Sequence, residues 1–159
     1  MISSLVLLIL AAPPAHADLS FARSKAVKAL IDSQSKEDSN RHGRAKEFVG
    51  GRRVAGSDLD GGGNDKLVVL FTLEQGNVWT QFLGVFGPGS KPVARKRVGG
   101  KGDRRVELTE VTKGRIELAT RTYGQADALC CPSIEGHSWF VLRGTALDED
   151  QADIIVVKH

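Results

Sequence analysis

The residues with the most distinctive chemistry are two adjacent cysteines, Cys130 and Cys131, in the segment LCCPS at positions 129–133. They are the only cysteines in the chain. Across a trans peptide their Cα atoms are expected about 3.8 Å apart, whereas disulfides usually span about 4.4 to 6.8 Å. A bond between them would therefore be strained and easy to reduce. It would also add little stability, because it closes almost no chain.

Four interpretations of the cysteine pair are open: a disulfide that stiffens a loop, a buried dithiol, a link to another chain, and a redox or soft-metal site. Vicinal thiolates bind Cu(I) or Zn²⁺, and His137 is the one further ligand nearby. Because only thiolates in favourable surroundings react, we favour a local structural role. The cysteines and Pro132 would then stiffen a loop close to Trp139, which makes residues 129–138 a candidate binding surface.

A second segment has the composition of a cation-binding turn. Residues 58–65 read DLDGGGND and carry the carboxylates of Asp58, Asp60 and Asp65. Alternate oxygen side chains in a glycine-rich turn are how a short loop wraps Ca²⁺. The segment resembles the calcium loops of FG-GAP-type β-propeller repeats and of dockerin-like proteins, with Asp58 and Asp60 at the first and third ligand places.

The match to those calcium loops is incomplete. Gly62 stands at the fifth place and Lys66 at the ninth, where carboxylates are required. An EF-hand fits less well, because its twelfth place would be Val69 instead of a bidentate Glu. We therefore expect a turn in which Asp58 or Asp60 accepts hydrogen bonds from local backbone amides. Calcium is the only cofactor that this segment suggests.

A third candidate is a basic segment that could face an anionic polymer. Its members are Arg95, Arg97, Arg104 and Arg105, together with Lys91, Lys96 and Lys101. In a strand, Arg95 and Arg97 share one face whereas Lys96 points to the other, so the charges are divided. No aromatic residue lies among them, so the stacking platform of single-stranded nucleic-acid binders is missing. We expect no nucleic-acid partner and favour a solvated, charged hairpin edge.

Catalytic motifs are not evident in the sequence. Ser133, His137 and Asp127 could be combined into a nucleophile set, but no Gly-x-Ser-x-Gly elbow fixes their geometry. The sequence has no phosphate loop, dinucleotide fingerprint or metalloprotease helix. A binding role is therefore favoured over an enzymatic one.

The first seventeen residues predict where the protein works. Residues 2–12 form an uncharged apolar run, followed by a proline pair and by Ala-His-Ala at 15–17. These are the parts of a secretory signal peptide cleaved after Ala17. No Lys or Arg precedes the run, which leaves an uncleaved anchor or a misplaced start codon as the alternatives. Spanning a bilayer takes about 20 apolar residues, so we expect a periplasmic or secreted protein with no membrane span once residues 1–17 are removed.

The chain after the leader, residues 18–159, has the length of one domain and carries the whole formal net charge of +3. Apolar residues at three- and four-residue spacing predict a helix over residues 19–39, capped by Asp18 or Ser20. The polar residues 33–44 have the composition of a loop and are predicted to be a flexible tether between the helix and the body.

The rest of the chain has the pattern of β-strands. The run 66–73 is apolar throughout, which predicts a strand covered on both faces. Further strands are expected at 78–86, 92–98, 106–109, 116–119, 138–143 and 153–158. The predicted fold is α+β and mainly β, with an N-terminal helix packed on an antiparallel sheet or sandwich of about six to eight strands. Its expected divisions are a signal peptide at 1–17, the helix and tether at 18–44, and a β-rich body at 45–159.

One hairpin can be predicted in register. A three-residue loop at 112–114 pairs Leu108 with Leu118 and places the apolar side chains on one face, with a glycine at the left-handed position. A two-residue loop would place Glu110 opposite Glu117, which is unfavourable. We therefore expect the three-residue loop.

Three segments together carry a family resemblance: GSDLDGGGNDKLVVLFTLE, VGGKGDRRVELTEV and YGQADALCCPSIEGHSWFVLRG. They resemble a group of small exported bacterial proteins of unknown function, which share a DLDGDG-like turn, a VGGKG turn and a Cys-Cys-Pro-Ser segment. The resemblance spans residues 56–147 and implies export and a compact β-rich domain. It implies no reaction.

The favoured function is a non-enzymatic binding or interaction module of the bacterial envelope, with an envelope protein as its partner and residues 129–138 as its surface. One alternative is a thiol-dependent redox or soft-metal-handling protein that uses the two cysteines. Another is a binder of anionic envelope polymers through the four arginines of the basic segment.

Overall fold

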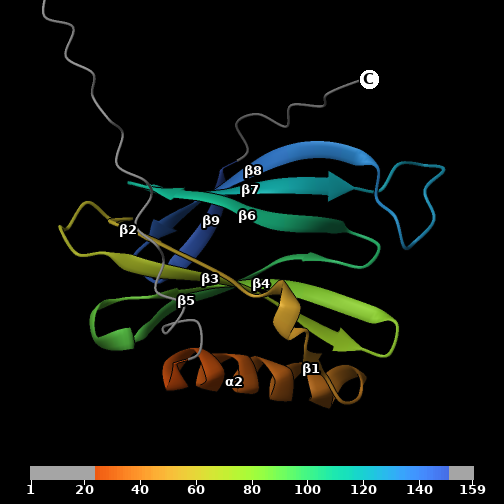
Figure 1. Ribbon diagram of the computed structural model, residues 1–159, viewed down its shortest axis with the longest axis horizontal. Coiled ribbons are helices and arrows are strands. Elements are labelled where there is room, and N and C mark those ends of the chain that lie inside the picture. The colour runs from red at the N-terminus through yellow and green to blue at the C-terminus, as the bar shows by residue number, and fades with distance from the viewer. Residues whose placement is uncertain (1–23, 151–159) are drawn as a thin grey trace, which may run out of the picture.

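The structure is a computed structural model that describes residues 24–150. It contains a helix and a nine-stranded antiparallel sheet (Figure 1). The elements are α2 (Lys25–His42), β1 (Lys46–Glu47), η1 (Val49–Gly51), β2 (Arg53–Ser57), β3 (Lys66–Gln75), β4 (Val78–Phe86), η2 (Pro88–Ser90), β5 (Pro92–Gly100), β6 (Arg104–Thr112), β7 (Arg115–Thr122), β8 (Ile134–Arg143) and β9 (Ala146–Asp150). The predicted fold class is confirmed. The strand count exceeds the expected six to eight, because β1 and β2 precede the first predicted strand.

The sheet folds over on itself between β5 and β6. Its strand order is β1-β3-β4-β5-β6-β7-β8-β9, and β2 also pairs with β3. A single register pair, Gly100 with Arg104, links β5 to β6 in the sheet, and the strands β6 to β9 turn over and lie above β2 to β5 (Figure 1). An apolar core fills the space between these two halves. Its largest fully buried members include Leu70, Leu83, Leu118, Ile116 and Phe140.

The helix α2 covers the other face of β3 and β4, which gives the molecule three layers (Figure 1). Successive strand residues point to opposite faces. Val68 and Leu70 of β3 therefore enter the core between the two halves, whereas Val69 and Phe71 pack beneath the helix. All four are buried, which confirms the prediction of a strand covered on both faces. The residues that the helix contributes to this second core are Val27, Leu30 and Ile31.

The helix α2 begins at Lys25 and continues beyond its predicted end. The Ser24 hydroxyl caps it by accepting a hydrogen bond from the Val27 amide at 3.3 Å. The prediction of a flexible tether over residues 33–44 is wrong, because the helix continues to His42.

Polar contacts with the body explain why the end of the helix is ordered. The Ser35 hydroxyl donates to the carbonyl of Ala45 at 2.7 Å, and the Ser39 hydroxyl accepts from the Ala45 amide at 2.8 Å. From the sheet, the Gln75 amide donates to the carbonyl of Asp38 at 3.3 Å. The prediction depended on the spacing of apolar residues, which does not reveal polar contacts between distant segments.

The hairpin of β6 and β7 has the predicted register but a different turn. Leu108 pairs with Leu118, as predicted. The loop has two residues, at 113–114, and its glycine has a φ of 80°. A register shift between Leu108 and Glu110 compensates for the shorter loop, and Glu110 lies opposite Glu117. The three-residue loop was therefore wrong, because a bulge within β6 supplies the extra residue.

Three predictions fall outside the described residues: the signal peptide at 1–17, the helix caps Asp18 and Ser20, and the strand at 153–158. Among residues 24–150, no helix combines the length and the apolar character that a membrane crossing requires.

Candidate functional site

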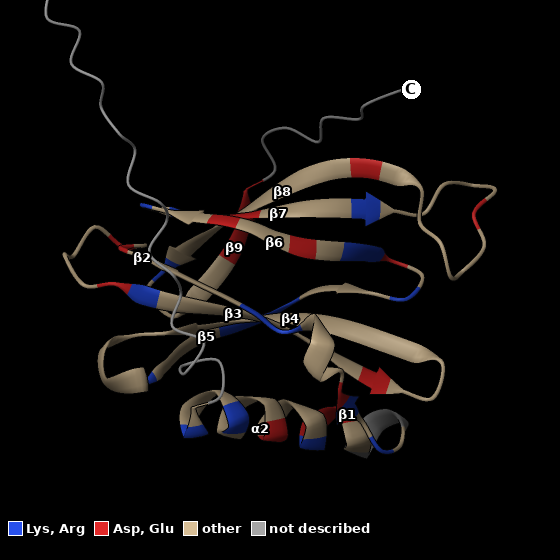
Figure 2. Cartoon of the chain, in the orientation of Figure 1, with Lys and Arg blue, Asp and Glu red and all other residues tan. Residues whose placement is uncertain are grey.

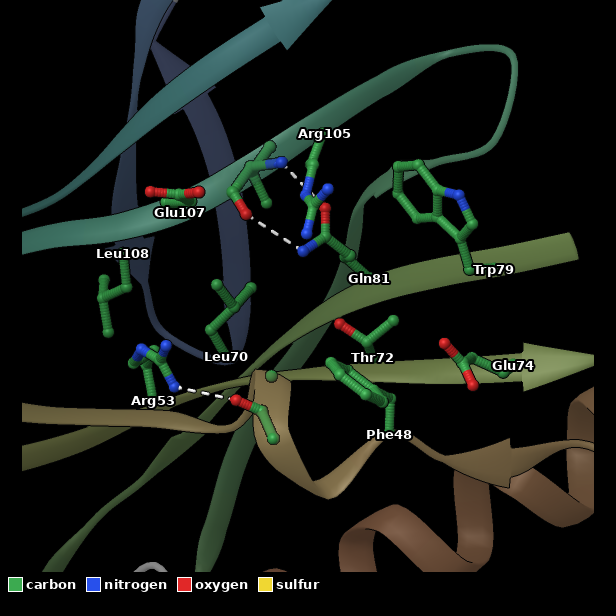
Figure 3. Close-up of a pocket in the computed structure, with 13 residues that line it drawn as sticks. Phe48, Arg53, Leu70, Thr72, Glu74, Trp79, Gln81, Arg105, Glu107 and Leu108 are labelled. Carbon is green, nitrogen blue, oxygen red and sulfur yellow. Dashed lines mark hydrogen bonds between the residues drawn. The ribbon is translucent and has the colours of Figure 1, made fainter. Parts of the chain in front are cut away.

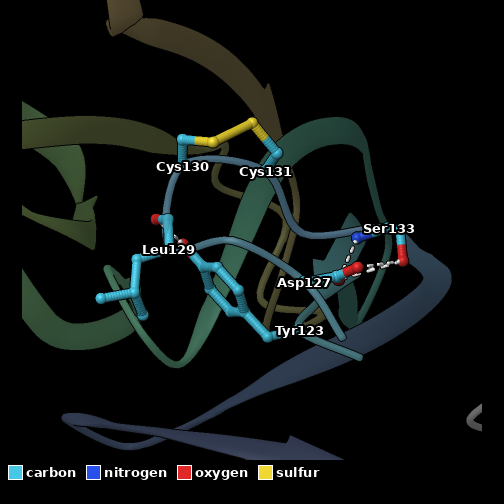
Figure 4. The surroundings of a disulfide bond; sticks show 6 residues. All are labelled: Tyr123, Asp127, Leu129, Cys130, Cys131 and Ser133. Atoms are coloured by element: carbon cyan, nitrogen blue, oxygen red, sulfur yellow. Dashed lines mark hydrogen bonds between the residues drawn. A yellow bond between two sulfur atoms is a disulfide. The ribbon is translucent and has the colours of Figure 1, made fainter. Parts of the chain in front are cut away.

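The cysteine pair lies in the loop between β7 and β8, residues 123–133, which we name the disulfide loop (Figure 4). The Asp127 carboxylate organises it. It accepts hydrogen bonds from the Gly124 amide at 2.7 Å, the Ser133 amide at 2.8 Å and the Ser133 hydroxyl at 2.8 Å. The bond from the Gly124 amide, followed by those from Ser133, lowers the pKa of Asp127 below its ordinary value. One charged group thus holds both ends of the loop together.

The disulfide loop turns polar groups inward and presents apolar and sulfur atoms outward. The Tyr123 hydroxyl donates to the carbonyl of Leu129 at 2.9 Å, whereas the Leu129 side chain points away and is 61% exposed (Figure 4). Cys130 and Cys131 are joined in a disulfide with Cα atoms 3.8 Å apart, and both are exposed. Pro132 is half-buried. Of the four interpretations of the cysteine pair, this geometry matches the disulfide within a loop.

His137 and Trp139 lie away from the disulfide loop. Both are on the outer face of β8, where their rings stack with centroids 6.3 Å apart. His137 Nδ1 lies 3.1 Å from Glu117 Oε1, and the Arg115 guanidinium lies over the Trp139 ring at 5.5 Å. Trp139 is five residues into β8, which is about 17 Å along a strand. Residues 129–138 were expected to form one loop, but β8 begins at Ile134, so only residues 129–133 of that candidate surface belong to the disulfide loop.

The nucleophile set considered from the sequence is not assembled. Ser133 and Asp127 are in contact, but Asp127 accepts from both the amide and the hydroxyl of Ser133 as a structural anchor. His137, which would have to be the base, pairs with Glu117 on the strand.

The glycine-rich segment 58–65 forms a turn held by its own side chains. Asp60 accepts from the Gly62 amide at 3.3 Å, and Asp58 accepts from the Gly63 amide at 3.1 Å. The ammonium group of Lys66 lies 2.8 Å from the Asp60 carboxylate, and its hydrogen bond lowers the pKa of Asp60 below the ordinary value.

The carboxylates of this turn do not converge on one point. Asp65 is exposed, and residues 24–150 contain no group of three or more His, Cys, Asp or Glu side chains placed to hold a metal ion. The geometry is that of the expected Gly-rich turn, in which Lys66 supplies the positive charge beside Asp60.

Three of the four arginines of the basic segment pair with separate acidic partners. Arg95 pairs with Glu37 of the helix at 2.9 Å, Arg97 with Asp103 at 3.2 Å, and Arg104 with Glu149. As predicted, Lys96 points to the other face, where its ammonium lies 5.9 Å from the centroid of the Phe140 ring. Figure 2 shows basic and acidic positions interspersed on α2 and β6. The charges do not form one basic surface.

A cleft of about 400 Å³ is lined by residues of β3 and β4, of the facing strand β6, and of the segment 48–53 (Figure 3). We name it the inner cleft. The floor of the cleft is formed by side chains of β3 and β4 that lie on the same face as the core residues of these strands. Three pairs across β3 and β4 follow one another: Leu70 with Leu83, Thr72 with Gln81, and Glu74 with Trp79. The side chains change from apolar to polar along this row, so the core opens into a polar mouth.

Phe48 forms one wall of the inner cleft. Its amide donates to the carbonyl of Thr72 at 2.9 Å, which fixes the chain just before η1. The ring lies against Gly50 and Gly51, where an added Cβ would come within 3.3 Å and 3.0 Å of the ring carbons. Glycine at both positions therefore lets the ring lie on the backbone, while 48% of the residue stays exposed.

Gln81 connects the inner cleft to the opposite half of the sheet. It is 6% exposed, its amide nitrogen donates to the carbonyl of Val106 at 2.9 Å, and its oxygen accepts from the Val106 amide at 2.8 Å (Figure 3). The side chain thus takes the place of a neighbouring strand at the point where β6 leaves β5. Removing it would leave both backbone groups of Val106 without this partner.

Four charged side chains border the inner cleft: Arg53, Arg105, Glu74 and Glu107. Arg53 is held by the carbonyls of Gly50 and Arg52 at 3.1 Å and 2.9 Å. Two guanidinium groups and two carboxylates give the border no net charge. This site was not predicted from the sequence, because its parts lie far apart in the chain and each is ordinary on its own. The one local signal was the pair of adjacent glycines, Gly50 and Gly51, shortly after Phe48.

Comparison with known proteins found no matching family model, no matching curated protein and no matching solved structure. The described residues form a small, mainly β protein in which a helix packs on a folded antiparallel sheet. Its two candidate sites are the disulfide loop and the inner cleft.

Proposed function

We propose that this chain is a non-enzymatic binding module of the bacterial envelope, and that it contacts a protein partner through the disulfide loop. The signal-like residues 1–17 and the resemblance to small exported bacterial proteins support export to the periplasm or the medium. A disulfide in the described part of the chain supports an oxidising compartment.

The observation that carries this proposal is the way in which the disulfide loop presents Leu129. Asp127 and Tyr123 fix the backbone from within, and the exposed leucine and disulfide face solvent. Loops held by a rigid scaffold frequently carry binding residues. A loop that is already fixed also loses less conformational entropy when it binds. An exposed apolar side chain beside sulfur atoms suits an apolar patch on another protein.

Site-specific crosslinking in native cells tests this proposal. A photoreactive phenylalanine analogue replaces Leu129 in the full-length chain, and a second chain carries it at Lys113, an exposed position at the other end of β7. We expect a discrete protein adduct from position 129, weakened when Asp127→Ala is added, and no such adduct from position 113. Identical adducts from both positions, or no adduct from position 129 in correctly exported protein, would contradict the proposal.

Exposure of the disulfide favours a second candidate, thiol–disulfide exchange with a partner. A thiolate of the partner would attack one sulfur, form a mixed disulfide and release the other sulfur as a thiolate. This candidate requires the cysteines themselves, whereas the binding module requires the shape of the loop. The double variant Cys130→Ser, Cys131→Ser separates them: adduct formation at position 129 that persists supports binding, and its complete loss supports exchange.

A further inference from the structure

We propose that the inner cleft is a second binding site, and that its ligand is an uncharged saccharide, recognised through its pyranose rings. This site is separate from the disulfide loop and does not depend on the function proposed for that loop. Its volume of about 400 Å³ lies in the range of about 300 to 1,000 Å³ that is usual for ligand pockets.

Two aromatic side chains border the inner cleft at the positions where a ring-shaped ligand would need them. Phe48 and Trp79 are both partly exposed and lie on either side of Thr72 (Figure 3). A pyranose ring has C–H groups on its faces, which pack against aromatic rings. Its hydroxyl groups lie around the rim and need hydrogen-bond partners. The Phe48 ring lies against Gly50 and Gly51, which support it on one side.

The polar groups of the inner cleft suit a neutral ligand with many hydroxyls. Arg53 and Arg105 supply planar sets of donors, whereas Glu74 and Glu107 supply acceptors. A polyanion or a polycation would meet two like charges for every two opposite charges. A saccharide hydroxyl donates and accepts, so it can pair with both kinds of side chain.

Gln81 makes an extended peptide the poorer occupant. Peptides that bind at a strand edge do so through main-chain hydrogen bonds. At the inner cleft the amide and carbonyl of Val106 already pair with the Gln81 side chain. The strand edge is therefore closed where it meets the cleft, and recognition is left to side chains.

Tryptophan fluorescence tests the proposal directly. The chain has two tryptophans, so Trp139→Phe leaves Trp79 as a single reporter inside the cleft. The full-length variant is titrated with three neutral tetrasaccharides: chitotetraose, maltotetraose and cellotetraose. We expect at least one to give a saturable change. Its Kd should change less than about twofold between about 50 and 500 mM salt, because no ion pair is formed.

A matched pair of variants assigns the binding to the cleft. Phe48 and Val78 are exposed to 48% and 47%, but only Phe48 borders the cleft. We expect Phe48→Ala to weaken binding about tenfold or more, as loss of an aromatic anchor does, and Val78→Ala and Leu129→Ala to leave it unchanged. Circular dichroism confirms that each variant is folded.

Three results would overturn the saccharide assignment. One is the absence of binding to all three tetrasaccharides by folded protein, seen both in fluorescence and in calorimetry. Another is equal binding by Phe48→Ala and the parent. The third is tighter binding of dextran sulfate or of tetra-alanine than of any neutral sugar. Failure of the crosslinking experiment on the disulfide loop has no bearing on these outcomes.

Discussion

The disulfide loop and the inner cleft are held in place by contacts of different range along the chain. In the disulfide loop, the bonds of Asp127 and Tyr123 join residues no more than 6 positions apart. In the inner cleft, Gln81 bonds to a residue 25 positions away in the other half of the sheet. A locally tied loop can open while the fold persists. A cleft framed by the two halves of the sheet depends on their remaining together.

The largest effect is expected at the frame of the inner cleft. Gln81→Ala leaves the Val106 amide and carbonyl without partners in a buried place, which should cost about 2 to 4 kcal/mol of unfolding free energy. The matched control is Gln34→Ala. Gln34 is also 6% exposed, and its amide donates to the Asp38 side chain within the same helix. We expect this control to lose less than about 1 kcal/mol, measured by urea denaturation. Equal losses of unfolding free energy in the two variants would show that the Gln81–Val106 hydrogen bonds between the two halves contribute no extra stability.

A smaller, local effect is expected in the disulfide loop. Asp127→Ala removes the acceptor of the Gly124 and Ser133 amides, so hydrogen exchange in residues 123–133 should become about tenfold faster or more. The urea midpoint should change little, because these bonds connect neighbouring residues. Glu135→Gln is the control, since that exposed carboxylate pairs with Arg121 of the neighbouring strand β7. Slower exchange throughout, or an unfolding shift as large as that of Gln81→Ala, would contradict a local role.

The same contrast explains how much the sequence could predict. The strand at 66–73 is covered on both faces, as expected. A continuous apolar run is a local signal that directly indicates burial of both faces. The Leu108–Leu118 register was also correct, because alternation specifies which face is buried. The turn was wrong, since a bulge can compensate for a shorter loop without changing that face.

The candidate features that the sequence shows are local, whereas the inner cleft depends on distant segments. Two adjacent cysteines are visible in any sequence, and so is a turn rich in Asp and Gly. The inner cleft combines Phe48, Trp79 and Arg105, none of which is unusual alone. The candidate surface at 129–138 was expected to be a loop, but its residues from Ile134 onward belong to the strand β8.

Acidification should separate the two regions further. Hydrogen bonds from Gly124 and Ser133 lower the pKa of Asp127. Its stabilising effect is therefore fully present above the ordinary Asp pKa and is lost as the pH falls through the lowered value. Exchange in the loop should accelerate in that acidic window, after correction for intrinsic rates. Asp127→Asn should abolish this dependence.

Gln81 does not titrate, so Val106 should stay protected until the whole protein unfolds. Simultaneous loss of both protections would show that they form one cooperative unit.

The smallest effect is expected from the feature that is most conspicuous in the sequence. Cys130→Ser with Cys131→Ser removes a disulfide between neighbours, which closes almost no chain, so the unfolding free energy should fall by less than about 1 kcal/mol. Asp127 and Tyr123 still tie the loop, and exchange there should stay slower than in Asp127→Ala. The measurement compares urea denaturation of the double variant with that of the oxidised parent. A loss as large as that of Gln81→Ala would mean that the disulfide, and not the carboxylate, holds the loop in place.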